Sequence, residues 1–305
     1  MRQPAIFIDW GTTNFRAWLL DTVSGEVLDA IERGKGMASL PRDGFAAYCA
    51  SRIAPWRAGD AVPVYMAGMV GADQGWKTAP QLPLPVSCAG IAAEVVSAPG
   101  LENAWIVPGA RVPGETPDVM RGEEVQIFGA LALAGTDNGV LCLPGTHSKW
   151  ARVENGALSD FSTVMTGEVF GLLRNQSILA RSLPADGPPA SFDAAAFERG
   201  LRKARDSGGL LNQIFSVRSL FLQGSLAATG AADYLSGILI GQEIIAMAGR
   251  YPAGPQDLLL VAGDDLLERY RIALSQAGFG LHCVSAREAS LAGMRQVMQV
   301  HQARL

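Results

Sequence analysis

The sequence predicts an α/β protein of two domains built on mixed sheets, and three observations carry this prediction. The chain has 305 residues, more than a single hydrophobic core usually spans. A strand–loop–strand unit occurs twice, at residues 5–20 and 139–153, and a glycine turn follows each copy. After each copy, apolar strands alternate with helical patterns, an order typical of α/β layers.

The repeat also predicts where the chain divides. We expect an N-terminal domain of residues 1–120 and a C-terminal domain of residues 121–305. The closing helix, at about 286–305, is expected to pack back onto the first domain. No Pro-, Gly- or Ser-rich linker separates the halves, so the helix at 120–133 is expected to join them.

Hydrophobic periodicity assigns the individual elements. The first half is expected to hold a three-strand meander at 5–20 and 26–33, a helix at 43–56 and short buried strands at 62–66 and 104–108. The second half is expected to hold, in order, strands at 139–165, helices at 169–182 and 193–206, a long apolar helix at 231–250, a strand at 257–262, a helix at 263–276, a strand at 281–284 and a last helix at 286–303.

Composition removes several classes of function. The net charge is -4, with 49% hydrophobic and 18% charged residues, and no basic block points to nucleic acid as a partner. No apolar run reaches the ~18 residues of a membrane span, and no secretory leader pattern precedes the first strand. The four cysteines lack CxxC spacing, which argues against a zinc site or a disulfide framework. A cytoplasmic protein without membrane partners is therefore expected.

The first copy of the repeat ends its leading strand in Asp9 and continues through Gly11, Thr12 and Thr13. A tight Gly-Thr loop offers backbone N–H and hydroxyl donors to phosphate oxygens. A carboxylate at the end of the strand can hold Mg²⁺, directly or through water. The alternative is an acid that caps an ordinary hairpin, and the presence of a second copy favours the phosphate-binding interpretation.

The second copy supplies Gly145, Thr146 and His147 in the same place. Two such loops, facing each other across a cleft between the domains, would bind a string of phosphates. The sequence therefore predicts a nucleotide-dependent phosphotransferase. Gly263 and Asp264 follow a further strand and open a helix, where a nucleotide can approach backbone N–H groups, although any α/β connection resembles this pattern.

Two acids, Glu123 and Glu124, begin the helix that joins the halves. A hydroxyl that accepts a phosphoryl group needs a carboxylate to orient it and to take its proton. Helix-start acids in solvent are the commoner case, but the expected position beside the cleft favours catalysis. Glu123 is preferred over Glu124, and both remain candidates. Arg121 is expected to bind a substrate carboxylate or to neutralise its neighbours.

A glycine-rich segment at residues 67–77 contains Met69, Gly71, Trp76 and Lys77. Such a segment suits a wall or lid over a small polar substrate. The alternative places Trp76 in the core and Lys77 in solvent. The sequence does not decide between them.

Taken together, these segments resemble the sugar-kinase/heat-shock-70/actin superfamily and, more closely, the 2-dehydro-3-deoxygalactonokinase family. The matching segments run from the first strand to the last helices: residues 8–18, 66–71, 75–77, 120–126, 144–147, 149–150, 163–168, 261–263 and 269–270. Ser148 and Asp264-Asp265 depart from residues found in some relatives, and the second departure could alter nucleotide contacts.

The resemblance implies two actin/ribonuclease-H-like domains around a nucleotide cleft, with ATP and Mg²⁺ as cofactors. It implies phosphorylation of the terminal 6-hydroxyl of 2-dehydro-3-deoxy-D-galactonate in D-galactonate catabolism. The acid sugar or the transferring phosphoryl group is then expected to contact Arg16, Lys77, Arg121 and His147. Thr166, in the matching segment 163–168, is a further expected substrate residue.

Other functions stay open on the sequence alone. The same cleft could serve a phosphohydrolase that uses water or polyphosphate. It could also serve a related kinase for another epimer, or a regulator that binds nucleotide without catalysis. A Rossmann dehydrogenase fits poorly because Gly11 opens no GxGxxG run. The sequence does not set the oligomeric state, for which a homodimer is one candidate.

Overall fold

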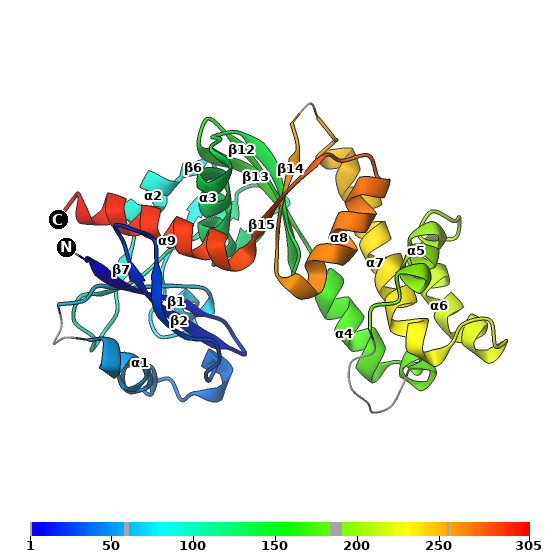
Figure 1. Cartoon of the computed structure of the whole chain (residues 1–305), viewed down its shortest axis with the longest axis horizontal. Coiled ribbons are helices and arrows are strands. Elements are labelled where there is room, and N and C mark those ends of the chain that lie inside the picture. Colours follow the sequence, from blue (N-terminus) through cyan, green and yellow to red (C-terminus); the bar gives the residue numbers. More distant parts are fainter. Residues whose placement is uncertain (1, 58–60, 184–190, 255) are drawn as a thin grey trace. The chain divides into compact units, whose positions relative to one another are not determined.

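A computed structural model of the chain describes residues 2–57, 61–183, 191–254 and 256–305. It divides into two compact units (Figure 1). Unit 1 comprises Met1–Gly139, Ala151–Phe161 and Ala286–Leu305, and unit 2 comprises Val140–Trp150 and Ser162–Ser285. The predicted boundary lies at residue 120, whereas packing assigns the joining helix to unit 1.

The described part of the chain forms these strands: β1 (Pro4–Trp10), β2 (Phe15–Asp21), β3 (Val27–Ile31), β4 (Val64–Ala67), β5 (Gln81–Pro83), β6 (Val86–Ser87), β7 (Val96–Ser97), β8 (Ala104–Ile106), β9 (Gly109–Val112), β10 (Asp118–Met120), β11 (Gly139–Leu143), β12 (Ser148–Glu154), β13 (Ala157–Val164), β14 (Leu258–Ala262) and β15 (Leu281–Ser285). Its α-helices are α1 (Phe45–Ile53), α2 (Cys88–Ala93), α3 (Glu123–Ala134), α4 (Thr166–Gln176), α5 (Ala194–Lys203), α6 (Gly209–Leu222), α7 (Ala228–Arg250), α8 (Asp264–Gln276) and α9 (Ala286–Gln302). Short 3₁₀ helices are η1 (Met37–Ser39), η2 (Ala54–Trp56), η3 (Met69–Gly71) and η4 (Ile178–Ser182).

The main sheet of unit 1 has the strand order β3-β2-β1-β4-β8-β7. The meander β1–β2–β3 is antiparallel, as predicted, and β4 and β8 continue from β1 in parallel. The register pairs Asp9 with Arg16 on β2 and with Ala67 on β4. A second sheet of three short strands has the order β10-β9-β5.

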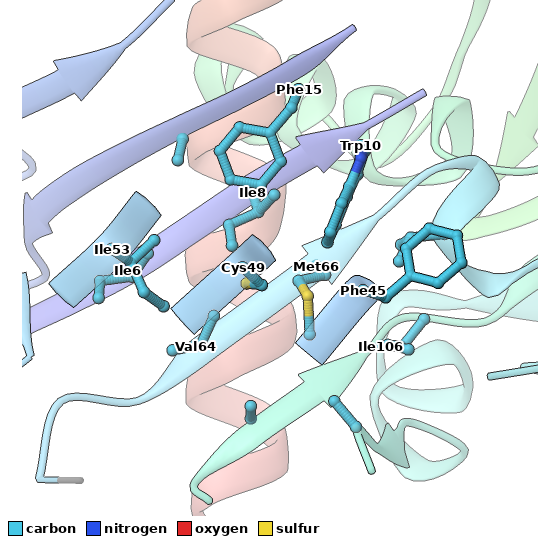
Figure 2. Close-up of a cluster of buried hydrophobic side chains, with 14 of the residues drawn as sticks. Ile6, Ile8, Trp10, Phe15, Phe45, Cys49, Ile53, Val64, Met66 and Ile106 are labelled. Carbon is cyan, nitrogen blue, oxygen red and sulfur yellow. The ribbon is translucent and has the colours of Figure 1, made fainter. Parts of the chain in front are cut away.

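One face of this sheet is covered by α1, which contributes Phe45 and other apolar residues to a buried cluster (Figure 2). Ile6, Ile8 and Trp10 point into this cluster from β1. Because side chains alternate along a strand, Asp9 lies on the opposite face. That is the face on which α9 contacts β1.

Helices α3 and α9 cross in unusually close contact within unit 1. A Cβ added to Gly129 of α3 would overlap the carbonyl oxygen of Ala289, and one added to Gly293 of α9 would overlap that of Val125. Glycine at both positions therefore lets the two backbones touch. This crossing anchors the helix whose first turn carries Glu123.

Unit 2 repeats the same strand order. Its strands β14 and β15 extend in parallel from β11, and β12 lies on the other side of β11. Strands β12 and β13 each contribute residues to both units, and the first part of β13 pairs with β6 in unit 1. The order β13-β12-β11-β14-β15 thus matches β3-β2-β1-β4-β8, and the internal repeat inferred from sequence is a repeat of topology.

The helices of unit 2 pack around α7, which contacts α4, α5, α6 and α8. The α5–α7 crossing again uses a glycine on each helix, Gly200 and Gly237. Helix α6 was not predicted; it begins at Gly209, directly after Gly208, and exposes Leu211 and Phe215. None of the described helices combines the length and apolar character that a membrane span requires.

We predict that Gly129→Ala destabilises the protein by about 3 kcal/mol, because the added methyl group overpacks a backbone contact. Gly171 in α4 is a matched control, since its added Cβ would meet no atom within 4 Å. Gly171→Ala is expected to stabilise by about 0.5–1 kcal/mol. Urea unfolding measures both; equal effects of the two substitutions would contradict the close crossing.

Candidate functional site

In unit 1, two parallel strands end side by side at the candidate site. Strand β1 ends at Trp10 and β4 ends at Ala67, and each is followed by a loop that contains glycine, Gly11 or Gly68. In α/β sheets, ligands bind outside the carboxyl ends of strands. Asp9 therefore stands at the edge where chemistry is expected.

Two glycines bring the start of α3 to this edge. Gly68 has φ +95° and Gly122, the residue preceding α3, has φ +107°. A Cβ added to Gly122 would lie 3.2 Å from the Cα of Gly68, and one added to Gly68 would lie 2.9 Å from the carbonyl oxygen of Trp10. Left-handed backbone and close approach both require glycine here. The contact sets the first turn of α3 beside Asp9.

The two glutamates of that turn have different surroundings. Glu124 is fully buried, and its two carboxylate oxygens lie 2.9 and 2.8 Å from the backbone nitrogen of Gly122, which donates to them. Glu123 is half-buried and accepts from the backbone N–H of Arg121 at 3.2 Å. Only Glu123 of the pair keeps accessible surface.

Charge and burial shift the acids of this cluster. Burial raises the pKa of Glu124 to about 8, Glu123 adds to the rise, and Arg121 opposes it. Burial also raises the pKa of Asp9; Arg16, 3.3 Å away, opposes the rise, and Glu123 adds to it. Asp9 and Glu123 are therefore close enough to interact electrostatically.

Arg121 links this turn to the glycine-rich segment. One guanidinium nitrogen, Nη2, donates to the carbonyl oxygen of Ala79 at 2.8 Å. The other, Nη1, is buried beside Gly71 and has no hydrogen-bond partner among the described residues. A buried donor without a partner is costly, and an anionic ligand would satisfy it.

The rest of the glycine-rich segment is divided between core and surface. Trp76 packs edge-on against Trp10, with ring centroids 6.2 Å apart, and its indole N–H donates to Pro99. This matches the packing alternative for Trp76. Met69 also packs against the core, while Lys77 is exposed. The exposure of Lys77 likewise matches the alternative that places it in solvent.

The Gly-Thr loop of unit 1 closes on itself through a hydrogen bond from the N–H of Gly11 to Asn14. Thr12 and Thr13 are exposed. A Cβ added to Gly11 would make only an ordinary contact, at 3.8 Å. The protein's own packing therefore does not require glycine at this position.

The corresponding loop in unit 2 has the same property. A Cβ added to Gly145 would meet no atom within 4 Å. Thr146 and His147 are exposed, and the Nε2 atom of His147 is paired with the carboxylate of Glu168 on α4. A backbone without a Cβ at this position leaves room for a ligand to approach closely.

Two segments flank this loop in unit 2. Thr166, at the start of α4, is buried and donates to Glu243 rather than facing solvent. Gly263 and Asp264 are exposed at the start of α8, and Gly263 has open space around its Cα. Sequence reasoning missed Glu168 and Glu243, because their contacts are with residues far away in sequence. The signal that could have pointed to Glu168 is its position in the family-matching segment 163–168.

The repeated strand order defines the chain as a protein of the actin-like α/β fold. A solved structure of the activator of 2-hydroxyisocaproyl-CoA dehydratase from Clostridium difficile has the same fold: TM-score 0.55, 9% identity, with 99% of this chain and 97% of that chain covered. At this identity the likeness concerns the fold alone.

The particular family follows from closer matches. Residues 9–297 match the model of the family described as 2-keto-3-deoxy-galactonokinase, and the chain belongs to that family. It is 38% identical to 2-dehydro-3-deoxygalactonokinase of Escherichia coli (strain K12) over 97% of this chain and 98% of that protein. A crystal structure from Sinorhizobium meliloti, assigned to the same enzyme, has TM-score 0.88 and 35% identity, covering 97% and 98% of the two chains. The predicted family and the predicted phosphotransferase class are confirmed.

The raised pKa of Glu124 makes a prediction for stability. A glutamate whose pKa rises from its ordinary 4.5 to about 8 on folding holds a proton that the unfolded chain releases. Its contribution to stability is present below the unfolded pKa and is lost as pH rises through about 8. The free energy of unfolding of wild type should fall over this window more steeply than that of Glu124→Gln.

Urea unfolding at a series of pH values measures this difference. Glu154→Gln, on the exposed end of β12, is the control and should run parallel to wild type. If the Glu124→Gln curve also ran parallel to wild type, Glu124 would have an ordinary pKa.

Proposed function

We propose that the protein transfers the γ-phosphoryl group of ATP to the terminal 6-hydroxyl of 2-dehydro-3-deoxy-D-galactonate. The observation that carries the proposal is the pair of acids at one sheet edge, Asp9 on β1 and Glu123 on α3, in a chain of the galactonokinase family. A phosphohydrolase is not favoured, because the curated relatives are kinases by name.

In the proposed mechanism Glu123 is the base. It orients the acceptor hydroxyl and takes its proton as the acceptor oxygen bonds to the γ-phosphorus. The bond from this phosphorus to the oxygen it shares with the β-phosphate breaks, and ADP leaves. The full burial of Glu124 favours Glu123 for this role, since a base must reach the proton it removes.

Phosphate binding is assigned to the two Gly-Thr loops. Thr12 and Thr13 in unit 1 and Gly145 and Thr146 in unit 2 would donate to the β- and γ-phosphates. This assignment is supported by Gly11, Gly145 and Gly263, at which an added Cβ would not clash with the protein. Arg16, Lys77, His147 and the unpaired Nη1 of Arg121 are proposed to meet the acid sugar or the transferring phosphoryl group.

The residues fit a magnesium ion. Within the described chain no three His, Cys, Asp or Glu side chains gather into a ready-made metal site, and Mg²⁺ commonly uses one or two carboxylates with phosphate oxygens and water. Asp9, with 36% of its side chain exposed, would hold it. When bound, Mg²⁺ supplies neutralisation of phosphate charge.

The test of the proposed function is a panel of 2-keto-3-deoxy sugar acids assayed with MgATP, with phosphorylated product followed by mass spectrometry. We expect ATP turnover to depend on the galactonate-derived acid and to exceed that with its epimers. ATP hydrolysis that is equal with and without any sugar acid would contradict a kinase and support a phosphohydrolase.

We predict that Glu123→Gln lowers kcat by a factor of about 10²–10⁴, the usual contribution of a general base. The kcat falls because the amide cannot take the proton. The KM for ATP should change little, because the substitution preserves the size of the side chain. Steady-state kinetics measures both parameters. Glu154→Gln is the surface control; a kcat for Glu123→Gln near that of this control would remove Glu123 from the mechanism.

A further inference from the structure

Glu243 is a buried carboxyl group with no part in the proposed mechanism. It lies on α7, next to Gln242, and only 3% of its surface is exposed. A carboxylate buried in a protein interior is costly unless its oxygens are hydrogen-bonded. The hydrogen-bond partners of Glu243 therefore decide whether it is tolerated in the interior.

Three side chains donate to this one carboxylate. The indole Nε1 of Trp150 lies 2.9 Å from Oε1, and the hydroxyl of Tyr270 lies 2.7 Å from Oε2. The hydroxyl of Thr166 donates to Oε2 as well. Burial raises the pKa of Glu243, and hydrogen bonds from Thr166, Trp150, Tyr270 and Ser148 oppose this rise.

Two of the donors come from segments of unit 2 that are assigned to nucleotide, and the third, Thr166, starts α4. Trp150 is on β12, directly after the Gly-Thr loop, and Tyr270 is on α8, which begins after Gly263. The hydroxyls of Ser148 and Tyr270 lie 3.1 Å apart and join these two segments a second time.

Thr166 connects the carboxylate to the loop itself. The next residue, Gly167, lies so close to Gly145 that an added Cβ would overlap the Gly145 carbonyl oxygen. The backbone N–H of Glu168 donates to the carbonyl oxygen of Thr146 at 2.9 Å, and its side chain holds His147. The position of Thr166 therefore sets the position of residues 145–147.

We propose that Glu243 is a positioning residue for nucleotide binding. Through its hydrogen bonds it holds three segments in one arrangement: the loop at residues 145–147, the start of α4, and helix α8. This proposal rests on the proposed function, since it takes the loop at residues 145–147 and the start of α8 as the phosphate and nucleoside contacts. Removal of the carboxylate leaves three buried donors without a common acceptor and frees the segments to move. A displacement of about 1 Å in such a site is enough to lower activity strongly.

The test compares Glu243→Ala and Glu243→Gln with Gln242→Ala. Gln242 is the neighbouring polar residue on α7, and its side chain donates to Ala204 and to Gln213, away from the loop. All three variants remove part of a buried hydrogen-bond network and should lower Tm. Glu243→Ala should also raise the KM for ATP by about tenfold or more.

Conservative replacement should rescue binding in part, because the amide of Glu243→Gln keeps one acceptor oxygen. Gln242→Ala should leave the KM for ATP unchanged. If Glu243→Ala does not fold, Tyr270→Phe, which deletes one donor, should raise the KM for ATP about fivefold, the equivalent of one hydrogen bond. A KM for ATP that is unchanged in the folded Glu243 or Tyr270 variants would overturn the proposal.

A second readout separates this proposal from the proposed function. The rise in Tm caused by MgATP is measured on pure protein without any sugar acid, and it should be smaller in Glu243→Ala than in Gln242→Ala. If wild type failed to phosphorylate the sugar acid, the proposed function would fall while this comparison still tested Glu243. Equal MgATP-induced rises in the two variants would overturn the role of Glu243 alone.

Discussion

The contact between Gly68 and Gly122 is the constraint on which the unit 1 site depends. One glycine follows β4 and the other precedes α3, both have positive φ, and their backbones meet at a distance that leaves no room for a side chain. Without this contact, the first turn of α3 would be held away from the end of β1. Asp9 and Glu123 would then lie too far apart for the roles that we propose for them.

The glycines at the helix crossings and those at the predicted nucleotide contacts differ physically. Those at the α3–α9 and α5–α7 crossings, and at Gly68 and Gly122, are required by packing or by φ. Those at Gly11, Gly145 and Gly263 are not, and they occupy the positions where the sequence predicts nucleotide contacts. The first group builds the units, and the second leaves backbone accessible to a ligand. This division follows from local geometry and does not depend on family membership.

Much of the fold could be predicted from sequence because the signals were local. The meander β1–β3 and helix α1 followed from hydrophobic spacing, and the repeat of topology followed from two similar segments. Helix α6 escaped prediction because apolar residues lie on its exposed side as well as on its buried side, which removes the helical periodicity. The two- and three-residue strands at the sheet edges are too short to leave a pattern.

For the candidate site, the sequence placed Asp9 near the end of a strand and Glu123 at the start of a helix, and the structure has both there; their chemical roles remain our proposal. The site was not predictable where a role depends on tertiary contact. Trp76 could be assigned to core or surface only once Trp10 was seen beside it, and Glu243 became visible only through donors far away in sequence. The difference in burial between Glu123 and Glu124 likewise arises from packing, which adjacent identical residues cannot reveal.

The most direct measurement is a crystal structure with a non-hydrolysable ATP analogue, Mg²⁺ and 2-dehydro-3-deoxy-D-galactonate. The account predicts the acceptor hydroxyl within about 3 Å of the Glu123 carboxylate, with Asp9 directed at the metal. A sugar acid bound with its hydroxyl away from Glu123, or a metal held without Asp9, would contradict it.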